Sequence, residues 1–422
     1  MTKIGTLLFL FLSLLYQIAV AQNDTVKLSL PQAEALFLKH NFELLAANYQ
    51  IDQAKAEIIT AKLFDNPELE YENLFYNHET GKFFQTSFAY GQFAGSISQL
   101  IKLAGKRNKN IKLAQSGAKM AEIEYFDLLR TLKFELRNTF YKAYFNAQSL
   151  QVYQEQLKST QSLLSAYETQ LKMGNVALKD VIRIKSLLIG LRAEQTNLLN
   201  ELEDNYRDLR LLCGLQPEAN FRLIRPESNE TIALDKIPYA SLLDSAKTNR
   251  SDLKLAKVAL EYNELNLKLQ KAMAIPDVEI ALSYDLKGNY PEKYTGLGLK
   301  IPIPLFNRNQ GEIKKAKIAI DAATTNVSKQ ELLLNNEVFN SYRTALRNEK
   351  LYSEINPEFN AGFAQLIAGL IKNFRERNIG LMEFLDLYES YKETVLQINN
   401  IQRERWSARE ELNYATGSNL FK

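Results

Sequence analysis

A strand that ends abruptly and continues as a long helix is the feature that most constrains this fold. The stretch 301–313 reads IPIPLFNRNQGEI, and the residues before it alternate between apolar and small or charged, as in a strand. Pro302 and Pro304 lack backbone N–H groups on the same strand edge, so we predict that strand pairing stops there. Asn307 and Gly311 then supply turn-forming residues before a run that is poor in Gly and Pro. We therefore expect a hinge between a strand and a helix.

The same hinge occurs earlier in a weaker form. Residues 99–107 align with residues 301–309 at a fixed offset of 202, and Gly105 falls in the turn. Other pairs correspond along the two halves at similar offsets: Pro67 with Pro276, Asn175 with Asn378, and Gly214 with Gly417. This pattern indicates a duplication, with structural repeats at 22–214 and 239–422 and a linker at 215–238. Each repeat should contain a helix, two strands, a very long helix, a tight tip and a final helix.

Four strands are predicted, two in each repeat. Residues 278–286 alternate most clearly, and residues 69–75, 84–101 and 297–303 show the same pattern, with a parity change near Gly91 that we interpret as a bulge. Such strands fit either a half-buried soluble sheet or a barrel with lipid outside and water inside. Four strands are too few to close a barrel, and open edges do not occur in lipid. The barrel interpretation therefore requires several copies of the chain to share one barrel.

Heptad spacing predicts long helices that fold back on themselves. Leu150, Leu157, Leu164 and Leu171 lie seven residues apart, and Gly174 interrupts the pattern before a second run of heptads. We expect an antiparallel helical hairpin in each repeat. Residues 30–64 should form one helix, and Pro357 should bend the long helix of the second half because a helix-interior proline removes a hydrogen bond.

Composition excludes several function classes. The net charge of +3 is small and evenly spread, which argues against nucleic acid as a partner. The single Cys213 excludes an internal disulfide, and residues 1–21 resemble a secretory signal peptide that ends in Ala-Val-Ala. His40 and His78 lie in different predicted elements, and no catalytic, phosphate-binding or metal-ligand motif is present. We expect a protein that is not an enzyme and that has no cofactor or metal site.

The duplication, the strands, the two hinges and the helix tips together resemble the TolC family of outer-membrane efflux proteins, and the hinge motif is similar to that of its heavy-metal (CzcC/CusC-like) branch. The resemblance implies a mainly α fold with a small β part: long coiled-coil hairpins plus four membrane strands per chain. It implies a homotrimer with a 12-stranded β-barrel, embedded in outer-membrane lipid of a Gram-negative bacterium and continued by a periplasmic α-helical barrel. Two departures from the branch are the absence of a lipid-modified Cys and the presence of Leu100 and Lys102 where the second hinge has its prolines.

The resemblance also implies a function: the passive exit duct of a tripartite efflux system for metal cations or small toxic compounds. Its partners would be a periplasmic adaptor (membrane fusion protein) and an inner-membrane RND-type pump. The alternative from a different class is a soluble periplasmic coiled-coil protein such as an adaptor. Adaptors need additional β segments around a single hairpin, whereas this chain has two hairpins.

By the same resemblance, acidic residues near the tips close the periplasmic entrance, and these are Glu383, Asp386 and Asp180. The alternative is that they are solvated residues that favour the positive end of a helix dipole. The adaptor would dock on the tips, at Gly174, Asn175, Val176, Leu178, Asn378, Ile379 and Leu381. These apolar tip residues could also serve only to hold the turn together.

Overall fold

A computed structural model describes residues 26–226, 234–288, 291–355, 369–374 and 376–421. The predicted signal peptide and the bend predicted at Pro357 lie outside these residues. The chain divides into two compact units, each of which contains segments from both predicted repeats. The helical unit comprises Met1–Leu45, Leu128–Asn249 and Asn335–Lys422, and the sheet unit comprises Ala46–Asp127 and Arg250–Leu334. The bounds of the two repeats and of the linker stay a prediction.

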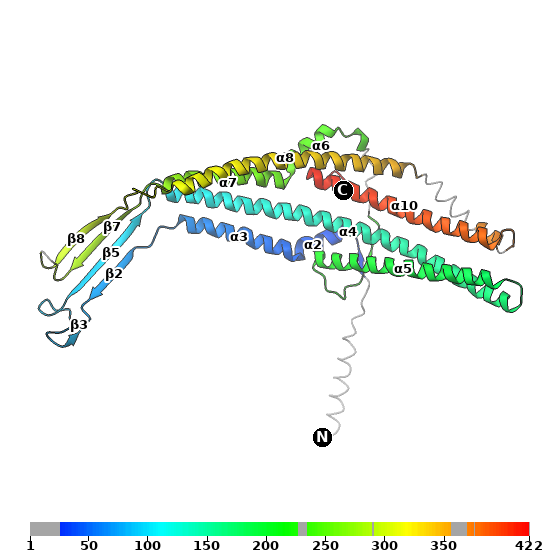
Figure 1. Ribbon diagram of the computed structural model, residues 1–422, viewed down its shortest axis with the longest axis horizontal. Helices are drawn as coiled ribbons and strands as arrows, with labels where there is room; N and C mark the ends of the chain where they lie inside the picture. Colours follow the sequence, from blue (N-terminus) through cyan, green and yellow to red (C-terminus); the bar gives the residue numbers. More distant parts are fainter. Residues whose placement is uncertain (1–25, 227–233, 289–290, 356–368, 375, 422) are drawn as a thin grey trace, which may run out of the picture. The chain divides into compact units, whose positions relative to one another are not determined.

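A four-stranded antiparallel sheet forms the β part of the sheet unit (Figure 1). Its strands, in spatial order, are β2 (Glu68–Asn73), β5 (Phe93–Ile101), β7 (Val278–Asp285) and β8 (Tyr294–Lys300). The central pair, β5 with β7, joins the two halves of the sequence. The strands β2 and β8 each keep one edge without a partner strand in this sheet.

The register of the sheet gives it one apolar face and one polar face. One row across all four strands contains only exposed branched aliphatic residues: Leu69, Ile97, Leu282 and Leu297. Leu69 and Leu297 are 81% and 79% exposed. The next row, on the opposite face, is acidic, hydroxylic or small: Glu70, Ser96, Ser283 and Gly296. Because side chains alternate along a strand, most neighbouring rows follow the same pattern; the exceptions include Gln99 and Thr295 on the apolar face and Leu100 on the polar face.

The prediction of a strand at 84–90 is wrong. A short hairpin, β3 (Tyr76–Asn77) with β4 (Lys82–Phe83), precedes this segment, and the segment itself forms turns. Phe84 has a left-handed φ of 49°. A Cβ on Gly91 would lie 2.2 Å from the carbonyl oxygen of Gln85, so the chain folds back through a contact that only glycine permits. The alternating residues at 84–90 therefore belong to a loop and not to a strand with a bulge.

Four helical segments of the sheet unit run next to one another. They are α3 (Phe42–Lys62, from Ala46), the start of α4 (Lys106–Lys172), α7 (Ser251–Met273) and the start of α8 (Gln310–Ser353). Ion pairs mark the neighbouring helices: Lys55 with Glu122 at 3.3 Å, Lys119 with Glu261 at 3.7 Å, and Lys257 with Glu331 at 3.8 Å. These pairs are exposed and add little stability, so they serve mainly to show which helices are adjacent.

The helical unit contains α2 (Leu30–His40), α5 (Leu178–Cys213), α6 (Tyr239–Asn249), α10 (Leu381–Thr416) and the later parts of α4 and α8. Its β1 (Val26–Leu28) and β6 (Phe221–Leu223) form a small parallel pair, and a 3₁₀ turn, η1, covers Leu234–Lys236. Across the described parts of the chain, no helix combines the length and the apolar character needed to cross a bilayer.

The predicted helix 30–64 is wrong in one respect, because it consists of two helices that meet at Asn41. The Asn41 Oδ1 accepts a hydrogen bond from the Leu44 N–H at 3.0 Å, which caps the second helix, and its Nδ2 donates to the Leu212 carbonyl at 3.0 Å. The second half has a similar interruption at Arg250, between α6 and α7. Asparagine favours such a cap because its short side chain competes with the helical backbone for hydrogen bonds.

Candidate functional site at the helix tips and hinges

The tip between α4 and α5 is a compact turn. Gly174 has a left-handed φ of 75°, and the Asn175 N–H donates to the Gln170 carbonyl at 3.0 Å. The Asn175 side chain repeats this link by donating to Gln170 Oε1 at 2.7 Å. A left-handed residue followed by this backward hydrogen bond is the Schellman ending of a helix.

The tip before α10 has the same turn with a different residue in the left-handed position. Arg377, which stands where the first tip has Gly174, has a φ of 64°, and the Asn378 N–H donates to the Asn373 carbonyl at 2.9 Å. An L-residue pays a steric cost of about 1–2 kcal/mol in this conformation. The second tip therefore keeps its shape at a backbone cost that the first tip avoids.

The apolar tip residues contribute mainly to packing. Val176 and Leu381 pack against one buried cluster, formed by Leu164, Val181, Ile184 and Leu188. Ile379 packs against a second cluster, formed by Leu370, Phe384 and Tyr388. Leu178 differs, since it is 59% exposed and belongs to neither cluster. Among the predicted apolar docking residues, Leu178 is therefore the one that protrudes from the chain.

The predicted gate carboxylates begin the two helices that leave the tips. Glu383 and Asp386 are exposed on the first turns of α10, three residues apart, while Phe384 between them is buried. No hydrogen bond or ion pair to their side chains is present within the described residues. Asp180 is half-buried in the first turn of α5. Carboxylates without cationic partners attract cations and repel anions electrostatically.

The Tyr167 phenol on α4 interacts electrostatically with both Asp180 and Arg377 of the second tip. Burial raises the pKa of the Tyr167 phenol, the Asp180 charge raises it further, and the Arg377 charge opposes the shift. The Tyr167 ring also lies parallel to Phe374, with a centroid distance of 6.4 Å. Asp180 and Arg377 therefore act on the same phenol, although the sequence places them 197 residues apart.

The first hinge is held by an ion pair that the sequence did not reveal. Ala104 and Gly105 are both left-handed, with φ of 57° and 65°, and α4 begins at the next residue. Lys106 is buried and its Nζ lies 2.7 Å from Asp277 Oδ1, which also accepts the Leu103 N–H at 2.8 Å. The Asp277 carboxylate therefore ties the first hinge to the segment that precedes β7.

The second hinge uses side-chain amides instead. β8 ends at Lys300, just before the segment that contains Pro302 and Pro304. Asn307 Oδ1 accepts the Asn309 N–H at 3.0 Å, and Asn309, with a φ of 58°, donates through Nδ2 to the Gln270 carbonyl at 2.8 Å. Gly311 lies inside α8 with open space around it, so its glycine character is not required there. The left-handed turn residue is Asn309, which tolerates this conformation better than most residues.

Comparison with known proteins decides which family has this architecture. Residues 35–215 and 242–355, well over half of the chain, match the outer membrane efflux protein family. The chain belongs to this family. This membership agrees with three predictions from the sequence: a mainly helical fold, an outer-membrane location and a resemblance to efflux channels rather than enzymes.

Two kinds of relative resemble this efflux protein. It is 24% identical to the cobalt-zinc-cadmium resistance protein CzcC of Cupriavidus metallidurans over 324 residues, which cover 72% of this chain and 73% of CzcC. Among solved structures, the Campylobacter jejuni CmeC outer membrane channel superposes with a TM-score of 0.77 at 14% identity, covering 92% of this chain and 85% of CmeC. CusC superposes with a TM-score of 0.73 at 17% identity, covering 95% and 96%. Similarity to CzcC and CusC agrees with the predicted heavy-metal branch.

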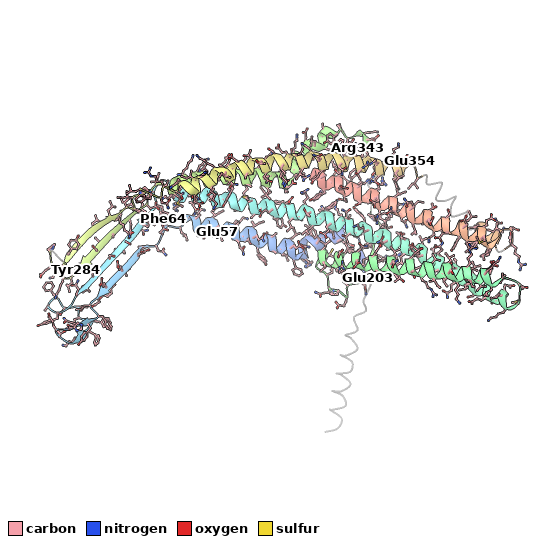
Figure 2. The ribbon with its side chains drawn as sticks, in the orientation of Figure 1. Glu57, Phe64, Glu203, Tyr284, Arg343 and Glu354 are labelled. Carbon is pink, nitrogen blue, oxygen red and sulfur yellow. The ribbon has the colours of Figure 1, made fainter. Side chains whose placement is uncertain are left out.

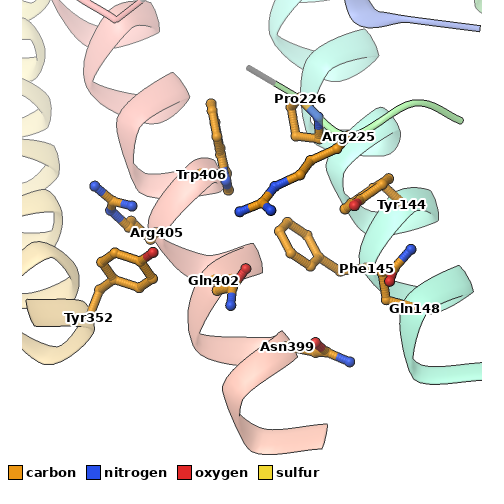
Figure 3. A pocket seen from close by; sticks show the side chains of 10 residues that line it. All are labelled: Tyr144, Phe145, Gln148, Arg225, Pro226, Tyr352, Asn399, Gln402, Arg405 and Trp406. Carbon is orange, nitrogen blue, oxygen red and sulfur yellow. The ribbon is translucent and has the colours of Figure 1, made fainter. Parts of the chain in front are cut away.

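A polar cavity of about 580 Å³ in the helical unit was not predicted (Figure 3). Figure 3 shows Arg225 extending between Trp406 of α10 and Tyr144 of α4, and the other labelled residues are Phe145, Gln148, Pro226, Tyr352, Asn399, Gln402 and Arg405. Arg405 is bound to Glu349 at 2.9 Å and stacks 3.9 Å from the Tyr352 ring centre, whereas Arg225 is exposed and has no hydrogen bond or ion pair within the described residues. The cavity offers cation–π and amide contacts. In the sequence, the only signal for this cavity was the single tryptophan, Trp406.

Proposed function

We propose that this efflux protein is the outer-membrane exit duct of a tripartite efflux system. Three copies of the chain form the duct, and the duct conducts its substrates passively. The observation that carries this proposal is the sheet with one exposed apolar face, one polar face and two free edges. An apolar face suits lipid and a polar face suits a water-filled lumen.

The free edges of β2 and β8 support assembly with other copies. A sheet edge in lipid has no water to satisfy its N–H and C=O groups, so each edge needs a strand from a neighbour. Four strands from each of three copies make a barrel with an even number of strands, which suffices to enclose a channel. Because β2 and β8 lie at opposite edges of the sheet, β8 of one copy can pair with β2 of the next.

We assign the periplasmic end of the duct to the tips. Glu383, Asp386 and Asp180 would form an acidic ring in a trimer, which favours cations at the entrance and which keeps the resting duct narrow. The two tips would dock the periplasmic adaptor, with exposed Leu178 as the main apolar contact. An inner-membrane RND-type pump would supply the substrate through that adaptor.

Metal cations are the substrate class that we favour over small toxic compounds. The support comes from the acidic polar face of the sheet and from the similarity to CzcC, whose name records cobalt, zinc and cadmium resistance. Within the described residues, no group of His, Cys, Asp and Glu side chains is placed to hold a metal ion. A duct that passes cations needs weak, distributed attraction rather than tight coordination.

Single-channel conductance in planar bilayers tests this proposal. Wild type should give small, cation-selective currents, and Glu383→Ala/Asp386→Ala should give larger currents with weaker cation selectivity. The matched control is Asp235→Ala/Asp244→Ala, which removes two exposed carboxylates outside the tips and should behave as wild type. Unchanged currents in the tip variant would refute the gate but retain the duct. A protein that remains soluble and never inserts would instead support a coiled-coil adaptor.

A further inference from the structure

Basic side chains gather where the helices of the sheet unit meet the sheet. The four helix–strand junctions, counted with about two helical turns each, are residues 57–67, 102–113, 268–277 and 301–317. They contain twelve Lys and Arg but only four Asp and Glu, a net charge of +8, although the whole chain carries only +3. The rest of the chain therefore carries 3 − 8 = −5, which offsets this positive charge only in part, and the charge is not evenly spread as the composition suggested.

Many of these cations have no internal partner. Lys102 and Lys106 are neutralised by Asp65 and Asp277, respectively. In contrast, seven exposed cations have no side-chain hydrogen bond or ion pair within the described residues: Lys62, Lys112, Lys268, Lys271, Arg308, Lys314 and Lys317. Unpaired basic residues on several converging helix ends are free to bind an anionic partner outside the chain.

Exposed apolar residues lie on the sheet side of the same cations. In the second hinge, Ile303 is 77% exposed and Phe306 is 92% exposed, and Arg308 lies two residues after Phe306. At the end of α3, Phe64 is 76% exposed and Lys62 precedes it; Figure 2 labels Phe64 where α3 leads into β2. Met273 and Ile275 after α7, and Leu103 before α4, repeat the arrangement. At all four junctions, apolar side chains thus lie next to the sheet and unpaired basic ones next to the helices.

This order of side chains matches the boundary of a phospholipid layer. Apolar and aromatic residues belong at the level where acyl chains meet headgroups, and Lys and Arg belong just outside, at the phosphates. The apolar face of β8 continues into the second hinge, because Leu297, Leu299, Ile301 and Ile303 share one parity. We propose that the four junctions form a collar that binds the phosphate headgroups of anionic phospholipids where the barrel leaves the membrane. This inference rests on the proposed membrane duct and adds its lipid partner.

A lipid co-purification experiment with the full-length protein tests the collar. The protein is reconstituted in vesicles of equal phosphatidylglycerol and phosphatidylcholine and extracted in mild detergent, and the retained lipids are quantified by mass spectrometry. Wild type should be enriched in phosphatidylglycerol. In Arg308→Gln/Lys314→Gln/Lys317→Gln, the enrichment should fall by at least fivefold, since each basic residue at a lipid surface is worth about a fivefold change in binding. High salt should reduce the wild-type enrichment in the same direction.

Lys158→Gln/Lys247→Gln/Lys254→Gln provides the matched control. It removes three exposed lysines without side-chain partners among the described residues, all outside the collar, and should retain the wild-type enrichment. Equal enrichment in wild type and both variants would overturn the proposal. An altered ion selectivity of the collar variant in pure phosphatidylcholine bilayers would also overturn it, because the cations would then line the conducting path. A protein that forms no channel but keeps charge-dependent enrichment would refute the duct and support the collar.

Discussion

A buried ion network in the helical unit allows a quantitative prediction. Arg137 of α4 donates two hydrogen bonds to Glu410 of α10, at 3.0 and 2.9 Å, and a third to Glu34 of α2 at 2.5 Å. Tyr141 also donates to Glu410, at 3.1 Å. Burial acts to lower the pKa of Arg137, but the charge of Glu410 and the bonds to both carboxylates outweigh it and raise the pKa. The guanidinium therefore stays charged at every practical pH.

Replacing Arg137 with methionine keeps the length of the side chain but leaves the Glu410 carboxylate buried without its cation. Removing one partner of a buried ion pair costs about 3–5 kcal/mol, which makes the unfolding equilibrium constant roughly 10²- to 5 × 10³-fold larger. Arg137→Met/Glu410→Met removes both charges, and replacing a buried pair with apolar residues is often neutral. We expect the double variant to be within about 2 kcal/mol of wild type, so the two substitutions should not be additive.

Guanidinium chloride unfolding in detergent micelles measures these changes. Trp406 is the only tryptophan, and its ring centre lies 5.1 Å from that of Tyr141, so its fluorescence reports on the network directly. The control is Arg207→Met, which breaks an exposed ion pair with Asp204 and should leave the unfolding midpoint unchanged. Additive costs of the Arg137 and Glu410 substitutions would refute the reasoning, because they would show that the two charges do not stabilise each other.

Three further predictions follow from buried contacts of the helical unit. Burial raises the pKa of the Cys213 thiol to about 12, so iodoacetamide at pH 8 should alkylate this thiol only after unfolding. The stabilisation that the protonated thiol contributes should be complete below about pH 9 and be lost as the pH rises toward 12. Alkylation of the folded protein, detected by mass spectrometry, would refute the prediction. Gly214→Ala places a Cβ 2.5 Å from the His40 carbonyl oxygen at a φ of 63°, so it should destabilise the unit by more than the ~1–2 kcal/mol of a left-handed residue, and an unchanged thermal midpoint would contradict it. Asn41→Ala loses the helix cap and the bond to Leu212, which should cost about 1–3 kcal/mol; circular dichroism melting should show the loss, and a melt that matches wild type would contradict it.

The sequence alone determined the elements whose signals are local. Alternation predicted β7 and β8, paired prolines and turn residues predicted the second hinge, and heptads with Gly174 predicted a helical hairpin with a tip. These patterns depend on neighbouring residues, which is why they can be read without a structure. The same local reasoning failed at 84–90, where the alternation belongs to a loop, and at Asn41, where one side chain ends one helix and caps the next.

Only the tertiary structure decided which distant residues meet. The pairing of β5 with β7 aligns Ile97 with Leu282 and so joins both halves in one apolar face. The Lys106–Asp277 ion pair connects residues 171 positions apart, and Arg137 reaches Glu410 over 273 positions. Such contacts depend on chain topology and on the cost of burying an unpaired charge, and neither is encoded in local spacing. The sequence therefore predicted the parts of this efflux protein, and the fold determined how they are held together.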